Sequence, residues 1–234
     1  MSEHKTILVT GAGKGIGRGL AEAMLKRGWQ VCGCSRAEST LKHDRYRHYQ
    51  TNVDDEDSVV SMFRRMAREG GELSALINCA GIARMNPALL TPASSATTIM
   101  NTNFNGTFVC CREAAKLMMR RKFGRIVNFG SIAVPLALAG EAVYGASKAA
   151  VEHLTRVLAR ELGGYGITVN CVSPNPIKTG LIDGVPEDML ERLVARQAIP
   201  RFGEIDDVIN AVDFFLRPES SLVTGQTVYL GGPP

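Results

Sequence analysis

The sequence predicts an α/β fold in which a doubly wound parallel sheet carries helices on both faces. Short apolar segments alternate with amphipathic, helix-like segments along the whole chain, and this alternation is typical of parallel sheets. The strand-like segments are apolar almost throughout, as expected for strands buried on both faces. Because no linker, repeat or low-complexity stretch divides the 234 residues, we expect a single domain over residues 1–234.

Local signals place each element. The first strand, Lys5–Thr10, leads into a glycine-rich turn, and a helix from about Gly15 to Arg27 stops before Gly28, a residue type that commonly ends helices. Hydrophobic periodicity then predicts further strands at Gln30–Ser35, His48–Val53, Leu73–Asn78, Arg125–Phe129, Ile167–Val172 and Thr227–Leu230. It predicts helices at about Asp55–Glu69, Ser95–Arg121, Tyr144–Gly163 and Glu204–Leu216.

Composition excludes several classes of function. Hydrophobic residues make up 45% and charged residues 21% of the chain, the net charge is +4, and no dense block of Lys and Arg suggests a nucleic-acid surface. No apolar stretch is long enough to cross a membrane, and no signal segment precedes the first strand. The six cysteines form no C-x-x-C pair and read as buried free thiols. We expect a cytoplasmic protein without a metal site.

The turn after the first strand has the spacing G-x-x-x-G-x-G, which is neither the G-x-G-x-x-G fingerprint nor a Walker A loop. Its glycines would let backbone amides approach a pyrophosphate, and the following helix would supply the positive end of its dipole. A turn that merely needs positive φ angles is the alternative. The context of a strand before and a helix after favours dinucleotide binding by Gly11, Gly13, Lys14, Gly15, Ile16 and Gly17.

The end of the second strand indicates which dinucleotide is bound. An acid at this place usually holds the ribose of NAD, whereas an arginine accommodates the 2′-phosphate of NADP. Here the strand ends in Ser35 and Arg36, and Lys14 adds a second positive charge. Glu38 is the nearest acid and keeps NAD open as an alternative. We expect NADP(H).

Tyr144 and Lys148 are four residues apart, so in a helix their side chains project from the same face. An ammonium beside a phenol stabilises the phenolate and lowers the pKa of the tyrosine from about 10. Such a tyrosine can act as a general acid or base. The pair alone is also compatible with an ordinary half-exposed helix face.

Taken together, these motifs resemble the short-chain dehydrogenase/reductase family along essentially the whole chain. The loop Thr10–Gly17 matches its cofactor loop, Asn78-Cys79-Ala80-Gly81 its Asn-Asn-Ala-Gly motif with Cys in second place, and Asn52-Val53 its Asp-Val pair beside the adenine. Ser131 precedes Tyr144 by the usual interval, and Asn103 matches the family's asparagine.

The resemblance implies a Rossmann-type fold and a reaction between a ketone and an alcohol. It assigns catalysis to Asn103, Ser131, Tyr144 and Lys148: Ser131 would hold the carbonyl oxygen, Tyr144 would donate the proton, Lys148 would tune Tyr144 and bind the nicotinamide ribose, and Asn103 would hold a water that relays protons. It assigns cofactor binding to Gly11, Gly13, Lys14, Gly15, Ile16, Gly17, Ser35, Arg36, Asn52, Val53, Asn78, Ala80, Gly81, Tyr144, Lys148, Pro174, Ile177 and Thr179.

One departure from the family lies after the sixth strand, where Asn175 replaces a usual glycine. Asn tolerates a left-handed backbone better than most residues, so we expect the turn to survive with Asn175 in that conformation. The larger side chain would reshape the substrate side of the nicotinamide, so the cofactor contacts of Pro174, Ile177 and Thr179 are less secure predictions than those of the loop.

Within the family the chain most resembles 3-oxoacyl-acyl-carrier-protein reductases of fatty acid biosynthesis. The segment Leu181–Ala198 would be a substrate lid, and its apolar residues suit either an acyl chain or the packing face of a short helix. Arg125 could help to dock a carrier protein, but Tyr165 stands where a basic residue is often found. A free small ketone, sugar or polyketide intermediate is the alternative substrate, and an NADP-sensing regulator without turnover is a distant one. The resemblance also implies a homotetramer or homodimer.

Overall fold

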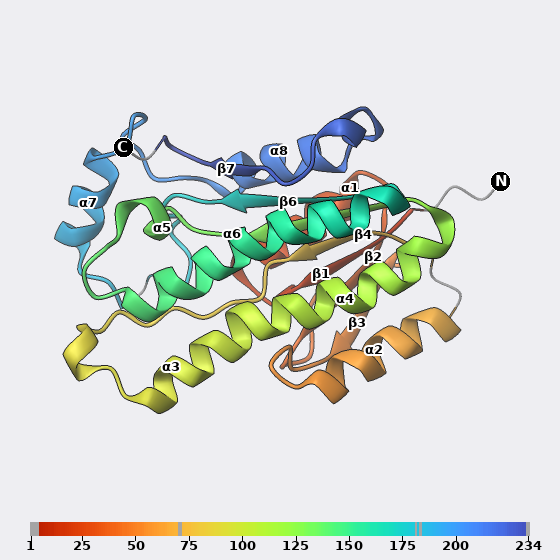
Figure 1. The fold of residues 1–234 in the computed structure, drawn as a ribbon, viewed down its shortest axis with the longest axis horizontal. Helices are drawn as coiled ribbons and strands as arrows, with labels where there is room; N and C mark the ends of the chain where they lie inside the picture. Colours follow the sequence, from red (N-terminus) through yellow and green to blue (C-terminus); the bar gives the residue numbers. More distant parts are fainter. Residues whose placement is uncertain (1–4, 70–71, 181, 183, 233–234) are drawn as a thin grey trace.

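The computed structural model describes residues 5–69, 72–180, 182 and 184–232, and its centre is one seven-stranded sheet (Figure 1). Every neighbouring pair of strands is parallel, in the order β3-β2-β1-β4-β5-β6-β7. The strands are β1 (Thr6–Thr10), β2 (Gln30–Ser35), β3 (Tyr46–Gln50), β4 (Leu73–Asn78), β5 (Gly124–Phe129), β6 (Ile167–Ser173) and β7 (Thr227–Tyr229). The order reverses direction between β1 and β4, which confirms the predicted doubly wound, Rossmann-type sheet.

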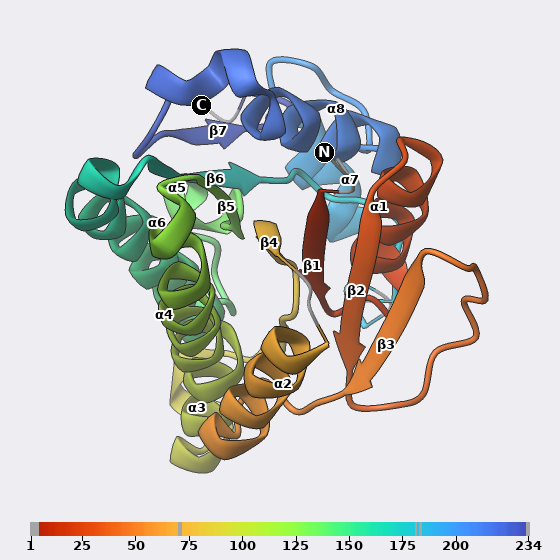
Figure 2. The ribbon, with the colours of Figure 1, turned by 90° about the vertical axis from the view of Figure 1, so that its right-hand side faces the viewer.

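Helices cover both faces of this sheet (Figure 2). On β1, Leu8 belongs to one apolar cluster, whereas its neighbours Ile7 and Val9 belong to the other, as the two-residue period of a strand dictates. The first cluster is completed by α2 (Glu56–Arg68), α4 (Gly106–Met118) and α6 (Ala142–Leu162). The second is completed by α1 (Gly15–Lys26) and α8 (Ile205–Leu216).

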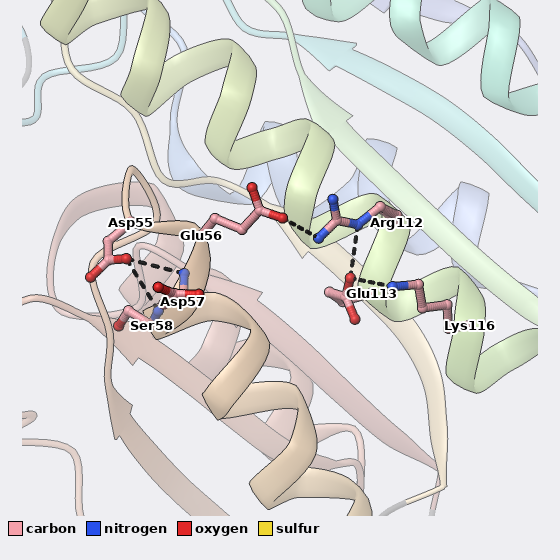
Figure 3. A network of polar contacts seen from close by, with 7 residues as sticks. All are labelled: Asp55, Glu56, Asp57, Ser58, Arg112, Glu113 and Lys116. Carbon is pink, nitrogen blue, oxygen red and sulfur yellow. Dashed lines mark hydrogen bonds and ion pairs between the residues drawn. The ribbon is translucent and has the colours of Figure 1, made fainter.

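Polar contacts set how α2 meets α4 (Figure 3). The side chain of Asp55 caps α2 by accepting hydrogen bonds from two backbone amides of its first turn, at 3.1 and 3.3 Å. Arg112 on α4 bridges Glu56 (2.8 Å) and the buried Glu113 (2.8 Å), and Lys116 donates to Glu113 at 2.6 Å. Exposed ion pairs contribute little free energy, so this network chiefly fixes the orientation of the two helices.

Two predicted boundaries are wrong, and each has a local cause. The third strand is Tyr46–Gln50 rather than His48–Val53: it lies at the sheet edge with one buried side chain, so periodicity marks it weakly. Val53, which suggested the longer strand, is buried in the turn that follows.

The predicted helix Ser95–Arg121 is interrupted in its middle. It consists of α3 (Ala93–Met100), a π-helical turn at Asn101–Asn105 (η2), α4 and a final 3₁₀ turn at Met119–Arg121 (η3). A π turn inserts one extra residue and often marks a functional site. The short helices α5 (Ala133–Leu136) and α7 (Glu187–Ala195) and the turn η1 (Ala88–Leu90) were not assigned from the sequence.

Three further features bear on the class of protein. All six cysteines are free, and four of them are buried. Among the described residues, no helix combines the length and the apolarity that crossing a membrane requires. The same residues hold no group of three or more His, Cys, Asp or Glu side chains placed to bind a metal ion.

Substitution by alanine is expected to have opposite effects on stability at two helical glycines. A Cβ on Gly106 would lie 2.7 Å from the backbone oxygen of Val53, whereas a Cβ on Gly145 would meet no atom closer than 3.7 Å. Alanine gains about 1 kcal/mol over glycine in a helix, but overpacking costs about 1–3 kcal/mol. We expect Gly106→Ala to lower the free energy of unfolding in urea and Gly145→Ala to leave it unchanged or raise it. Equal stability of the two variants would contradict this close approach of α4 to the turn at Val53.

Candidate active site

The carboxyl ends of the strands border a cleft of about 1510 Å³, at the place where the strand order reverses. This is where ligands bind in open parallel sheets. Eighteen of the predicted site residues line it: Gly11, Gly13, Lys14, Gly15, Ile16, Gly17, Ser35, Arg36, Asn52, Val53, Ala80, Gly81, Ser131, Tyr144, Lys148, Pro174, Ile177 and Thr179. The two others, Asn78 and Asn103, lie behind the cleft wall.

The glycine loop presents an open helix end to this cleft. Lys14, the residue before α1, has an extended backbone and no capping side chain, and no acid stands in the first turn of the helix. The backbone amides that a cap would otherwise occupy are therefore available to an anion. Gly17 has no space for a Cβ because the carbonyl oxygen of Gly11 lies against it, and Gly11 itself has a φ of +71°. The loop therefore has room for a pyrophosphate in direct contact with its backbone amides.

Positive charge gathers at the β2 end of the cleft. Lys14 and Arg36 line it, and within the described part of the chain neither takes part in an ion pair. Arg18 also lines the cleft but is paired with Glu22 at 2.5 Å. The hydroxyl of Ser35 donates to the carbonyl oxygen of Ala37 at 2.8 Å. Two unpaired cations suit a phosphate group at this end.

Ser131, Tyr144 and Lys148 come together where β5 ends beside α6. The ammonium of Lys148 donates to the carbonyl oxygen of Phe129 at 2.9 Å and lies 5.9 Å from the centre of the Tyr144 ring. The Ser131 hydroxyl lies near enough to the Tyr144 hydroxyl to act on its pKa, and it accepts from the backbone N–H of Ala133 at 3.1 Å. All three side chains are buried, so a carbonyl group that reached them would leave water behind.

Burial determines the protonation of this group. It raises the pKa of Tyr144 to about 12, assisted by the nearby Glu141 and opposed by the hydrogen bond of Ser131. Burial also lowers the pKa of Lys148. The expectation that Lys148 lowers the pKa of Tyr144 is wrong, because the pKa is raised by burial. The side chains that act on this pKa are Ser131, Glu141 and Cys79, whereas the ammonium of Lys148 is turned towards Phe129. Tyr144 is a neutral phenol at neutral pH, the form that can donate a proton.

Asn103 lies in the π turn and reaches this group from behind. Its side chain accepts from the N–H of Ile82 at 2.8 Å and donates to the carbonyl of Ile82 at 2.9 Å and to Ser147 at 3.0 Å. A Cβ on Gly81 would lie 3.3 Å from Oδ1 of Asn103 and 3.5 Å from Nζ of Lys148. Gly81 therefore lies between the side-chain amide of Asn103 and the ammonium of Lys148, and the absence of a Cβ at this glycine leaves both groups close to its backbone.

Asn78 does not line the cleft. It is 3% exposed and donates to Oδ1 of Asn128 at 2.9 Å and to the sulfur of Cys111 at 3.2 Å. Its side chain thus joins β4 to β5 and α4 and holds the neighbouring Ala80 and Gly81 in place for the cleft.

A family model described as enoyl-(acyl carrier protein) reductase matches residues 11–232. The chain belongs to the short-chain dehydrogenase/reductase family. It is 33% identical over 242 residues to the 3-oxoacyl-[acyl-carrier-protein] reductase FabG of Staphylococcus aureus, covering 99% of this chain and 98% of that one. It is an oxidoreductase of this family.

Solved structures of the family superpose closely. ElxO with NADP bound gives a TM-score of 0.89 at 29% identity, and 4-hydroxyisoleucine dehydrogenase complexed with NADH gives 0.88 at 26% identity. Each comparison covers 97% of both chains. These short-chain dehydrogenases/reductases thus carry either dinucleotide on the same fold, which leaves the choice of cofactor to local residues.

Asn175, the departure from the family pattern, is held by side-chain contacts rather than by an unusual backbone. The positive φ angles of the described non-glycine residues are at Lys122 and Ala137, so the expected left-handed conformation of Asn175 is wrong. Its Nδ2 donates to Oε1 of Gln197 at 2.9 Å and to the carbonyl of Arg201 at 3.0 Å. The amide fits because Gly203 has no Cβ to obstruct it.

The lid predicted over Leu181–Ala198 contains α7, which stands at one end of the molecule (Figure 1). Its apolar residues fall into two groups. Val194 is buried, whereas Ile182, Val185, Met189, Leu190 and Leu193 line the cleft. Leu181 lies outside the described residues. Gln197 follows α7, so Asn175 anchors the base of this lid to the loop that carries Ile177 and Thr179.

Several cleft residues escaped sequence analysis. Arg84, Arg192 and Arg196 line the cleft beside the predicted set, as do Cys79 and Glu141. Glu141 precedes α6, is half-buried, and has no ion-pair partner in the described residues. No motif marks substrate-facing residues in this family, although the position of Glu141 one turn before Tyr144 was a usable signal.

We expect Asn175→Ala to loosen the lid. The change leaves the buried Gln197 amide without its partner, and an unsatisfied buried polar group costs about 1–3 kcal/mol. Hydrogen exchange of peptides that cover 187–200 should accelerate while exchange in β1 and β4 stays unchanged. Asn210→Ala, at an exposed position on α8, is the matched control. Unaltered exchange over 187–200 would show that Asn175 does not anchor α7.

Proposed function

We propose that the protein reduces the ketone of a 3-oxoacyl thioester, linked to acyl-carrier protein or coenzyme A, to the hydroxy product. The observation that carries this proposal is the meeting of the Ser131 and Tyr144 hydroxyls in a cleft that α7 lines with apolar side chains. The two hydroxyls can hold a carbonyl oxygen, and the apolar side chains of α7 can cover an acyl chain. The similarity to 3-oxoacyl-[acyl-carrier-protein] reductases supports the same substrate class.

We propose NADP(H) as the cofactor, which supplies the hydride when it is bound. Lys14 and Arg36 would hold the 2′-phosphate, and the amides at the start of α1 would hold the pyrophosphate. The NADP complex of ElxO supports this assignment. Glu38, which also lines the cleft, keeps NAD as the alternative.

The residues of the chain would divide the remaining work. Ser131 would donate a hydrogen bond to the ketone oxygen, and Tyr144, neutral because of its burial, would deliver a proton to that oxygen as negative charge develops. Lys148 would hold the nicotinamide ribose and stabilise the phenolate left on Tyr144. Asn103, close to Lys148 across Gly81, would hold the water through which the proton is replaced.

A free small ketone, sugar or polyketide intermediate is the second candidate substrate. Two observations favour it. Arg125 is 3% exposed, contacts the ring of Phe123 and does not line the cleft, so it offers a carrier protein no free cation. Glu141 places a carboxylate in the cleft, which suits the hydroxyl groups of a polyol.

Other properties stay predictions. We propose that residues 1–234 form a single domain that assembles into a homotetramer or homodimer. A cytoplasmic location and a place in fatty acid biosynthesis follow from the cysteine content and from the similarity to the acyl-carrier-protein reductases.

The direct test is NADPH consumption with a 3-oxoacyl thioester. In Tyr144→Phe we expect kcat to fall by roughly 10²- to 10⁴-fold, because the proton donor is lost, while the dissociation constant for NADPH stays unchanged. Tyr165→Phe, at an exposed tyrosine outside the cleft, should retain full activity. Binding of NADPH without turnover on any ketone, with both variants alike, would favour a regulator over an enzyme.

Arg36 provides the test of the cofactor. Arg36→Asp replaces a cation by an anion, and hydrogen bonds to charged groups contribute about 1.5–3 kcal/mol, so we expect the preference for NADPH over NADH to fall by roughly 10- to 100-fold in kcat/KM. Arg64→Asp, an exposed change of the same charge on α2, is the control. A wild-type protein that prefers NADH tenfold would refute the assignment.

A further inference from the structure

Glu152 is a buried carboxylate that none of the steps above uses. It lies on α6, one turn after Lys148, and is 7% exposed. Ser173 donates to its Oε1 at 3.0 Å and Tyr229 to its Oε2 at 2.6 Å. Glu113, the other buried glutamate of the described residues, is bonded by Arg112 and Lys116. Glu152 has hydroxyl partners but no cation in contact.

The carboxylate is pressed against the strand end that carries the active site. A Cβ on Gly130 would lie 2.7 Å from Oε1 of Glu152. The residue before Gly130 is Phe129, whose carbonyl oxygen accepts the hydrogen bond of Lys148, and the residue after it is Ser131. Lys148 and Glu152, one helical turn apart on α6, therefore lie against the neighbouring residues Phe129 and Gly130.

Glu152 is the carboxylate among the groups that act on the pKa of Lys148. Burial lowers the pKa of Lys148, and Cys171, Cys79 and Glu152 act in the opposite direction. Burial raises the pKa of both thiols to about 12, so the two cysteines carry no charge at neutral pH. Of the three groups that act against burial, Glu152 is therefore the one that can carry a negative charge beside the buried ammonium.

The other titratable groups around Lys148 do not supply this charge. Tyr144 on its own helix is neutral, and so is Tyr229 on β7, whose pKa burial raises. Glu141 lies a turn beyond Tyr144 and raises the pKa of Tyr144, not that of Lys148. Arg156, further along α6, acts on Tyr229.

We propose that Glu152 is a positioning residue for catalysis: its buried carboxylate is the counter-charge that keeps Lys148 an ammonium beside Tyr144. The effect on rate rests on the proposed function, whereas the charge of Lys148 does not. An anchor between α6 and the two last strands would need two hydrogen bonds, which a neutral amide also forms if one of the two hydroxyls accepts instead of donating. A buried charge without a contacting cation is costly, and stabilising a second buried charge gives it a role.

The test compares Glu152→Gln, which removes the charge and keeps the shape, with Tyr229→Phe, which removes one hydrogen bond and keeps the charge. The side-chain carbon next to the ammonium of Lys148 is followed by ¹³C NMR in the protein without cofactor, with Lys148→Arg for assignment. We expect the pKa of Lys148 to fall by about one unit in Glu152→Gln and to stay unchanged in Tyr229→Phe. Equal titration of Lys148 in wild type and a folded Glu152→Gln would overturn the proposal.

A second measurement needs no variant that might fail to fold. The carboxyl-carbon resonance of Glu152 in the wild-type protein should be that of a carboxylate at neutral pH, and a carboxylic acid there would overturn the proposal.

In the active enzyme, removal of a negative charge lowers the pH at which the Lys148–Tyr144 pair loses its first proton. The basic limb of kcat/KM for reduction should therefore move to lower pH in Glu152→Gln and stay in place in Tyr229→Phe. Both NMR experiments hold even if no ketone proves to be a substrate.

Discussion

One hydrogen bond, from Nζ of Lys148 to the carbonyl oxygen of Phe129, joins helix α6 to the end of strand β5 at 2.9 Å. Everything else in the site is placed relative to it. Ser131 follows Phe129 by two residues, and Tyr144 precedes Lys148 by one helical turn, so fixing the lysine on the strand brings both hydroxyls together. The parallel sheet supplies the rest of the geometry, because it ends all its strands at the same edge as the cofactor loop.

This hydrogen bond is buried, and burial governs the chemistry more than any charge does. On an exposed helix face, the ammonium of a Lys would lower the pKa of the Tyr, and the phenolate of the Tyr would raise the pKa of the Lys, as the sequence suggests. In the interior each loses hydration, so both shift towards their neutral forms. For Tyr144 the neutral form is the useful one in reduction. For Lys148 it is not, which is why a buried carboxylate one turn away is significant.

The sequence predicts the elements that have a regular hydrophobic period and the residues that belong to a recognisable motif. The sheet, the helices α1, α2, α6 and α8 and the glycine loop follow from periodicity and from glycine spacing, since these reflect burial and backbone approach directly. Residues whose role depends on contacts far along the chain could not be found. Asn175 and Gln197 are 22 residues apart and meet only once α7 is in place. Asn103, in the π turn, forms two hydrogen bonds with Ile82, which lies 21 residues earlier in the chain and which no local pattern connects to it.

The cleft also constrains the form in which a 3-oxo substrate enters. Glu141 lines the cleft and is close enough to raise the pKa of Tyr144, so a ketone that reached Tyr144 would lie near its carboxyl group. A free 3-oxo acid carries its own carboxylate near the ketone, and two like charges in a partly desolvated cleft repel strongly. A thioester carries no charge at that carbon. Met189, Leu190 and Leu193 then suit the acyl chain, while Arg196 suits the phosphate of a carrier arm. The placement of charge in the cleft thus favours a thioester over the free acid.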